Sequence, residues 1–126
     1  MIETYKEFVF EAAHQVPPHS TLHGHTFKVG VVFRGEPDPI YGWAENLDRV
    51  EADIETLRKR IDHSYLNDID GLECPSLENV ARWVWRHLEK DYPTLATVSV
   101  TRGSAGNAEG CTYYGETYRQ ATQVAA

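Results

Sequence analysis

Three histidines near the start of the chain constrain its fold more than any other feature of the sequence. His23 and His25 flank a single glycine, and His14 precedes His23 by nine residues. Residues two apart in an extended strand project to the same face, so His23 and His25 point the same way. Four of the chain's six histidines, His19 included, fall within these twelve residues, which argues against unrelated surface histidines.

The histidine pair runs directly into the strongest strand pattern of the sequence. Alternate positions of this segment are apolar: Phe27, Val29, Val31 and Phe33. Such alternation predicts a half-buried strand over 25–34, and His23 and His25 continue the face of Phe27. Three neutral imidazoles with an open fourth position are typical of catalytic zinc. With a third histidine on a neighbouring strand, we therefore expect Zn²⁺ to be held by His14, His23 and His25.

The remaining elements give an α+β pattern in the order strand, strand, helix, helix, strand, strand. Further strands are expected at 4–13, 97–102 and 112–118, with a glycine-rich turn at 103–110. One amphipathic helix is predicted from apolar residues at spacings of three and four: Leu47, Val50, Ile54, Leu57 and Ile61. Ser76 is expected to cap a second helix.

Length and charge restrict the class of protein. The 126 residues predict one domain over 1–118, with a frayed tail at 119–126. A core of this size is small, so self-association is expected. The formal charge of −7 weighs against nucleic acid and anionic membranes as partners. The sequence has neither a signal-peptide pattern nor an apolar run that spans a bilayer, so we expect a cytoplasmic protein. Cys74 and Cys111 are expected to be reduced thiols.

Several short motifs follow one another along residues 4–118, each occurring once: Phe10-Glu11-Ala12-Ala13-His14, Leu22-His23-Gly24-His25, Gly35-Glu36 with Asp38-Pro39, Gly42-Trp43, Asn46-Leu47, Asp62-His63 with Tyr65-Leu66-Asn67, and Pro75-Ser76-Leu77-Glu78-Asn79. The spaced set resembles the 6-pyruvoyltetrahydropterin synthase and 6-carboxytetrahydropterin synthase family. The resemblance implies the tunnelling fold, a four-stranded antiparallel sheet with two helices on one face. It also implies a homohexamer in which the strands of three subunits close a barrel and the active sites lie between subunits.

The resemblance also implies roles for individual residues. His14, His23 and His25 match the family's zinc ligands, and Asp62 and His63 match its catalytic pair. A carboxylate beside a histidine fixes the tautomer of the ring and makes it a proton carrier near neutral pH. The alternative is a structural histidine at the end of a helix, where it interacts with the helix dipole.

His19 marks the first departure from the family pattern. The family's reactive cysteine stands four residues before the His-Gly-His motif, and His19 occupies that position here. Neither Cys74 nor Cys111 replaces the thiol by sequence position. An imidazole has an unperturbed pKa of ~6.5 and is able to move a proton. His19 is therefore a candidate proton carrier, an additional zinc ligand or a solvated loop histidine.

Arg102 marks the second departure. It stands where the family's glutamate binds the amino-pyrimidine edge of the pterin, and a guanidinium only donates hydrogen bonds. Glu109, in the expected turn after this strand, is a candidate for the missing carboxylate. Arg102 and Glu109 are thus the predicted substrate-binding residues. We expect poor turnover of dihydroneopterin triphosphate, because both the thiol and the anchoring glutamate have changed.

Three functions remain open at this point. The first is a zinc-dependent lyase of the pterin synthase type, acting on dihydroneopterin triphosphate or a related compound with loss of triphosphate. The second keeps the fold and the zinc but performs a retro-aldol cleavage, or acts on a different, anionic substrate. The third is a non-catalytic binding member of the fold. A retained Asp62–His63 pair argues against the third, since a protein that only binds has no need of a proton carrier.

Overall fold

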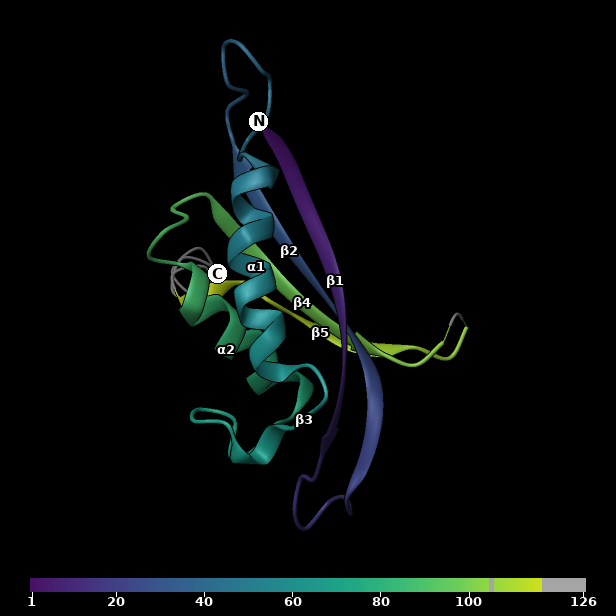
Figure 1. The fold of residues 1–126 in the computed structure, drawn as a ribbon. Helices are drawn as coiled ribbons and strands as arrows, with labels where there is room; N and C mark the ends of the chain where they lie inside the picture. The colour runs from purple at the N-terminus through teal and green to yellow at the C-terminus, as the bar shows by residue number, and fades with distance from the viewer. Residues whose placement is uncertain (105, 117–126) are drawn as a thin grey trace.

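The computed structural model describes residues 1–104 and 106–116, and these form a twisted sheet with two helices packed on one face (Figure 1). The sheet consists of β1 (Ile2–His14), β2 (His23–Gly35), β3 (Ser64–Tyr65), β4 (Leu95–Arg102) and β5 (Glu109–Tyr113), in the spatial order β3-β1-β2-β4-β5. The helices are α1 (Leu47–Ile61), α2 (Leu77–Leu88) and the short 3₁₀ helix η1 (Leu66–Asp68). The predicted α+β class is confirmed, and the expected tail at 119–126 lies outside the described residues.

The sheet contains one strand more than the sequence predicts. The four expected strands pair antiparallel, whereas the two-residue β3 pairs parallel to β1 at Ala12 and Ala13. Two residues are too few to show an alternating pattern, which is why β3 leaves no signal in the sequence. The position of β3 matters for the site, because Asp62 and His63 directly precede it and its pairing with β1 holds them beside that strand.

The core lies between the helices and one face of the sheet. Its β2 residues are the four apolar positions that alternate along the strand, all fully buried: Phe27, Val29, Val31 and Phe33. The helix α1 buries four of the five positions expected from its spacing, Val50, Ile54, Leu57 and Ile61, whereas Leu47 is half-buried. Asn46 and Ser76 cap α1 and α2, accepting hydrogen bonds from Asp48 N and Asn79 N.

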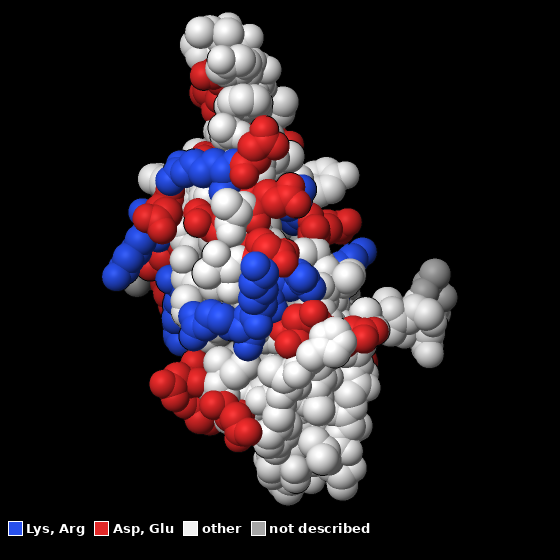
Figure 2. Space-filling model, viewed as in Figure 1, with Lys and Arg blue, Asp and Glu red and all other residues white. Residues whose placement is uncertain are grey.

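The helical face of the molecule carries mixed charge. Lys and Arg side chains are interspersed with Asp and Glu over this face, whereas the lower right of the view is largely uncharged (Figure 2). This distribution agrees with the acidic balance of the sequence and gives no single-sign field on the face shown. Among the described residues, the helices are too short or too polar to cross a membrane.

Candidate active site

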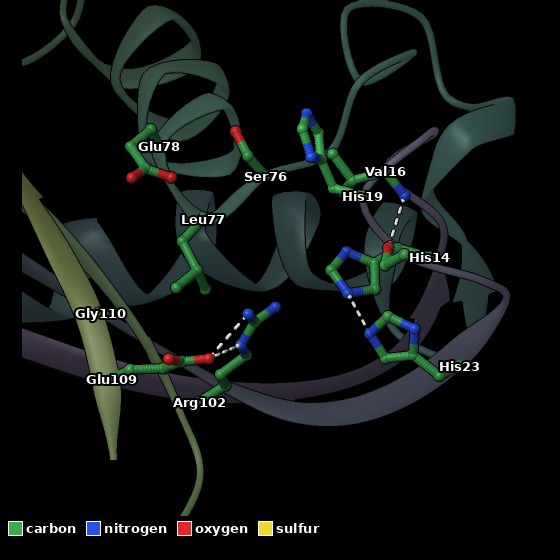
Figure 3. A pocket seen from close by; sticks show the side chains of 11 residues that line it. His14, Val16, His19, His23, Ser76, Leu77, Glu78, Arg102, Glu109 and Gly110 are labelled. Carbon is green, nitrogen blue, oxygen red and sulfur yellow. Dashed lines mark hydrogen bonds and ion pairs between the residues drawn. The ribbon is translucent and has the colours of Figure 1, made fainter.

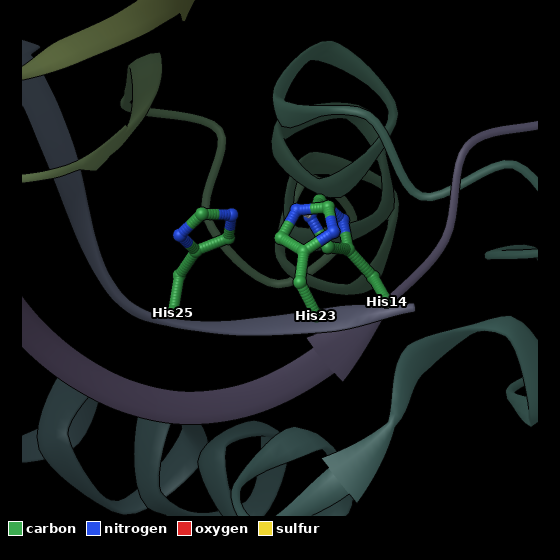
Figure 4. Close-up of side chains that lie close together, drawn as sticks. All are labelled: His14, His23 and His25. Carbon is green, nitrogen blue, oxygen red and sulfur yellow. Dashed lines mark hydrogen bonds between the residues drawn. The ribbon is translucent and has the colours of Figure 1, made fainter. Parts of the chain in front are cut away.

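The register of the β1–β2 hairpin brings the three histidines together. His14, the last residue of β1, is paired directly with His23, the first residue of β2. His25 follows two residues along β2 and therefore projects to the same face. Each residue offers one ligand nitrogen, and these nitrogens all lie within 4.8 Å of one another. Figure 4 shows the three rings gathered above the two strands.

Hydrogen bonds to the backbone fix the tautomers of two of these rings. Nδ1 of His14 donates to the carbonyl of Pro75 at 2.8 Å, and Nδ1 of His23 donates to the carbonyl of Thr21 at 2.5 Å. In neutral rings, both Nε2 atoms then carry lone pairs and no hydrogen. These two atoms nevertheless face each other at 3.0 Å. Only a proton or a cation between them makes this approach favourable, so the residues present fit a metal ion.

The third ring and the local electrostatics agree with this fit. Nε2 of His25 is buried and has no hydrogen-bond partner within the described residues. Burial, followed by the charge of Arg102, lowers the pKa of His25; burial also lowers the pKa of His14. Both shifts favour neutral imidazole, the form that ligates metal. The donor set of three imidazoles is typical of catalytic zinc among the common biological cations.

A pocket of about 420 Å³ opens beside the histidines (Figure 3). The walls include His14, His19, His23, Arg102 and Glu109. The structure therefore brings together two of the expected metal ligands, both expected substrate-binding residues and His19. His19 is exposed on the 15–22 loop, where its backbone N–H donates to the carbonyl of Val16 at 2.7 Å. It lies outside the cluster of three ligand nitrogens.

The structure corrects the expected position of Glu109. The sequence places it in a turn over 103–110 and starts the last strand at 112, but β5 runs from Glu109 to Tyr113. Glu109 pairs with Arg102 across β4 and β5, so their side chains project to the same face. The prediction failed because the glycines that indicated a turn do not exclude a strand, and Gly110 pairs within the ladder with Thr101. A carboxylate is thus held in the pocket beside Arg102.

Asp62 and His63 lie away from this pocket. They follow the end of α1, and His63 lines a second pocket together with Glu11, Thr26 and the triad residue His25. The side chains of Glu11 and Thr26 alternate with the core-facing residues of β1 and β2, and Thr26 Oγ1 donates to Glu11 Oε1 at 2.9 Å. Glu11 and Thr26 therefore project from the other face of the hairpin, whereas His25 belongs to the face of the histidine cluster. Within one chain, the structure does not bring His63 into the pocket of His14 and His23.

The Asp62–His63 pair is itself well formed. Nδ1 of His63 lies 3.0 Å from Oδ2 of Asp62, and Oδ1 of Asp62 accepts the backbone N–H of Glu11 at 2.9 Å. The Glu11 N–H, followed by His63 and Arg58, holds the pKa of Asp62 below its usual value, so the carboxylate is ionised near neutral pH. His63 adopts a positive φ of 57°, uncommon for a residue with a side chain, and its side chain is 76% exposed. Nε2 of His63 is the ring nitrogen that Asp62 does not engage.

Two features of the site were missed by the sequence analysis. The carbonyl of Pro75 orients His14, and Glu78, in the first turn of α2, also lines the main pocket. Pro75 and Glu78 both belong to the motif Pro75-Ser76-Leu77-Glu78-Asn79, which was noted only as part of the family pattern. The helix start at Ser76 was the feature of the sequence that could have indicated their position. Cys111 is not an activated thiol, because burial and then the charge of Glu78 raise its pKa.

Together, the fold and the histidine cluster define a tunnelling-fold protein with a three-histidine candidate metal centre. The chain matches the family model described as 6-pyruvoyl tetrahydropterin synthase over residues 3–116 and belongs to this family. It is 39% identical over 106 residues to 6-carboxy-5,6,7,8-tetrahydropterin synthase of Synechocystis, covering 76% of this chain and 82% of the relative. It is also 33% identical over 86 residues to dihydroneopterin monophosphate aldolase of Pyrococcus furiosus, covering 67% and 72% of the two chains.

The fold comparison agrees with the family assignment. The structure of 6-pyruvoyl tetrahydropterin synthase from Caenorhabditis elegans superimposes with a TM-score of 0.79, covering 91% of this chain and 96% of that one. The two sequences are 22% identical, so the likeness establishes the fold alone.

Proposed function

We propose that this protein is a zinc-dependent lyase that acts on the side chain of a reduced pterin such as dihydroneopterin triphosphate. The observation that carries the proposal is the approach of Nε2 of His14 to Nε2 of His23 at 3.0 Å, with both Nδ1 atoms committed to carbonyls. When bound, zinc supplies a Lewis acid that polarises a side-chain oxygen of the substrate and lowers the cost of removing an adjacent proton.

Side chains of this protein supply proton transfer and substrate binding. His63, with Nδ1 held by Asp62, carries a proton on Nε2, and His19 provides a second proton-carrying ring beside the metal ligands. Arg102 and Glu109 bind the substrate at the other end of the pocket. Because His63 lies outside the pocket of His14 and His23 within one chain, we propose that each complete site combines the triad of one subunit with the His63 of another. Such a shared site requires a homo-oligomer, which we propose is a hexamer.

A second candidate function is supported by a specific observation. A retro-aldol cleavage breaks a carbon–carbon bond of the side chain instead of releasing phosphate. The similarity to a dihydroneopterin monophosphate aldolase and the replacement of the family thiol by His19 both favour this chemistry. The two reactions differ in their products, so a single assay separates them.

The test is to incubate the zinc-loaded protein with dihydroneopterin, its monophosphate and its triphosphate, and to identify products by liquid chromatography and mass spectrometry. Release of inorganic triphosphate supports the synthase reaction, and release of glycolaldehyde or its phosphate ester without free triphosphate supports the aldolase reaction. The His23→Ala variant serves as the control without an intact triad. Absence of turnover on all three compounds contradicts the proposal and favours a binding protein.

A further inference from the structure

A chain of four charged or ionisable side chains runs along the last turns of α1. Glu55, Arg58 and Asp62 recur at spacings of three and four and therefore share one face of the helix end. Nε and Nη2 of Arg58 donate to the two carboxylate oxygens of Glu55 at 2.9 and 2.8 Å. Nη1 of the same guanidinium donates to Oδ2 of Asp62 at 2.9 Å. The fourth member is His63, whose Nδ1 contacts the same oxygen, Oδ2.

Oδ2 of Asp62 is therefore shared between Arg58 and His63. A carboxylate and the negative end of a helix each favour the charged form of a neighbouring imidazole. An imidazolium has no lone pair and is unable to accept a proton. Arg58 opposes both influences, because its positive charge is paired to the same oxygen that faces the ring. Glu55 in turn partly neutralises the charge of Arg58 and so limits how strongly Arg58 disfavours the imidazolium form of the ring.

The other groups around the ring do not take over this role. Glu11 on β1 directs its carboxylate to Thr26, and its backbone N–H and C=O bond to Asp62 Oδ1 and His63 N. His25 on β2 contributes to the same pocket as His63. Among the described residues, Arg58 is the one cation bonded to the carboxylate that holds the ring.

We propose that Arg58 is a positioning residue that keeps Nε2 of His63 available as a base near neutral pH by sharing the carboxylate of Asp62. The inference rests on the proposed function, in which His63 moves a proton. Arg58 itself does not reach the substrate pocket and acts only through Asp62.

The test is a histidine NMR titration of the zinc-loaded protein, with the His63 resonance assigned by its loss in His63→Ala. Arg58→Gln removes the positive charge and should raise the pH midpoint of the His63 titration by roughly 0.2–0.7 units, the range expected for a single exposed charge pair. Glu55→Gln leaves Arg58 unneutralised and should lower the same midpoint. Arg58→Lys keeps the charge and should restore a midpoint near that of the wild type.

Arg60→Gln is the matched control, because it removes the same charge from the same helix turn. Arg60 contacts His87 and Trp83, so this variant should move the His87 titration and leave His63 unchanged. Coincident His63 titrations in the wild type, Arg58→Gln and Glu55→Gln would overturn the inference. If Arg58→Gln fails to fold, Glu55→Gln alone decides, since a midpoint that does not fall contradicts the role of Arg58.

The activity profile separates this inference from the proposed function. If His63 is the proton carrier, the acid limb of the pH–rate profile moves with the NMR midpoint in each variant. A midpoint that moves while the rate profile stays fixed supports the role of Arg58 and removes His63 from the mechanism.

Discussion

Arg102 and Glu109 form a cross-strand ion pair in which Nε and Nη2 of the guanidinium both lie 2.7 Å from one carboxylate oxygen, Oε1. The second oxygen of Glu109 takes no part in this pair. A hydrogen-bond acceptor and a donor are therefore presented side by side in the pocket of the histidines. Although Arg102 is expected to stand where the family has a glutamate, the pocket still contains a carboxylate, because β5 supplies Glu109.

Glu109→Gln should weaken the binding of a pterin. The amide loses the negative charge and presents one acceptor instead of two, and an unmet donor costs ~1–3 kcal/mol, or roughly 5–150-fold in KM. kcat should change less than KM, because Glu109 is not one of the three clustered metal ligands. Steady-state kinetics checks the prediction, with Glu36→Gln as an exposed control far from the pocket. An unchanged KM would remove Glu109 from substrate recognition.

His23→Ala should abolish stoichiometric zinc binding. The wild type should hold one zinc per chain, and loss of a direct ligand should exceed the ~10–100-fold loss of affinity caused by removing an outer partner. Metal analysis after dialysis measures the stoichiometry. His87→Ala removes a histidine outside the cluster and should retain the metal. A full complement of zinc in His23→Ala would show that the triad is not the metal site.

His63→Ala should reduce kcat by roughly 10²–10⁴-fold, the usual contribution of a general acid or base. Asp62→Asn should reduce it as well, because the amide no longer fixes the proton on Nδ1 of His63. Zinc content should stay at the wild-type value in both variants, since neither residue belongs to the triad. Activity of His63→Ala within a few-fold of the wild type on the true substrate would contradict the assignment.

Mixed oligomers should recover activity from two inactive variants. If each site combines the triad of one subunit with the His63 of another, oligomers assembled from His23→Ala and His63→Ala chains contain some complete sites. The mixture, co-refolded or co-expressed, should be more active than either variant alone. Light scattering should independently show an oligomer. A monodisperse monomer at micromolar concentration, or a mixture no more active than its parts, rules out a shared site.

His19→Cys should increase turnover of dihydroneopterin triphosphate. The wild type is expected to remain below the ordinary enzyme range, ~10⁴ M⁻¹s⁻¹ in kcat/KM, because the family thiol is absent. Restoring a thiol beside the metal ligands should raise the rate by up to ~10²-fold, the lower end of what a positioned proton-transfer group contributes. His19→Ala is the matched control and should not gain activity. A wild type that already turns over rapidly contradicts the expectation.

The fold followed from sequence wherever burial produces a regular pattern. The alternation of β2 and the three-and-four spacing of α1 each reflect one buried face, and both elements were predicted close to their observed bounds. The gathering of His14 with His23 and His25 was also predictable, because β1 and β2 are neighbours in sequence and form a hairpin.

The parts that were not predicted depend on contacts between distant segments. Glu109 was assigned to a turn because glycines surround it, whereas its strand exists only through pairing with β4. The location of His63 outside the pocket of His14 and His23 depends on how the end of α1 meets β1 at Glu11. Local sequence carries no information on either contact. The chemical roles of Glu109 and His63 could therefore be predicted from the sequence, but their positions could not.

The hydrogen bond from His14 to the carbonyl of Pro75 has a thermodynamic consequence. It connects the end of the β1–β2 hairpin to Pro75, which precedes the cap of α2. A cation bound by the triad therefore stabilises the contact between the sheet and the helix layer through the ring of His14. A ligand that binds only the folded chain stabilises it by RT ln(1 + [L]/Kd), about 4.1 kcal/mol at a thousandfold excess over Kd. The melting temperature of this protein should therefore report the free metal concentration, and chelation should loosen the entrance of the pocket before the core unfolds.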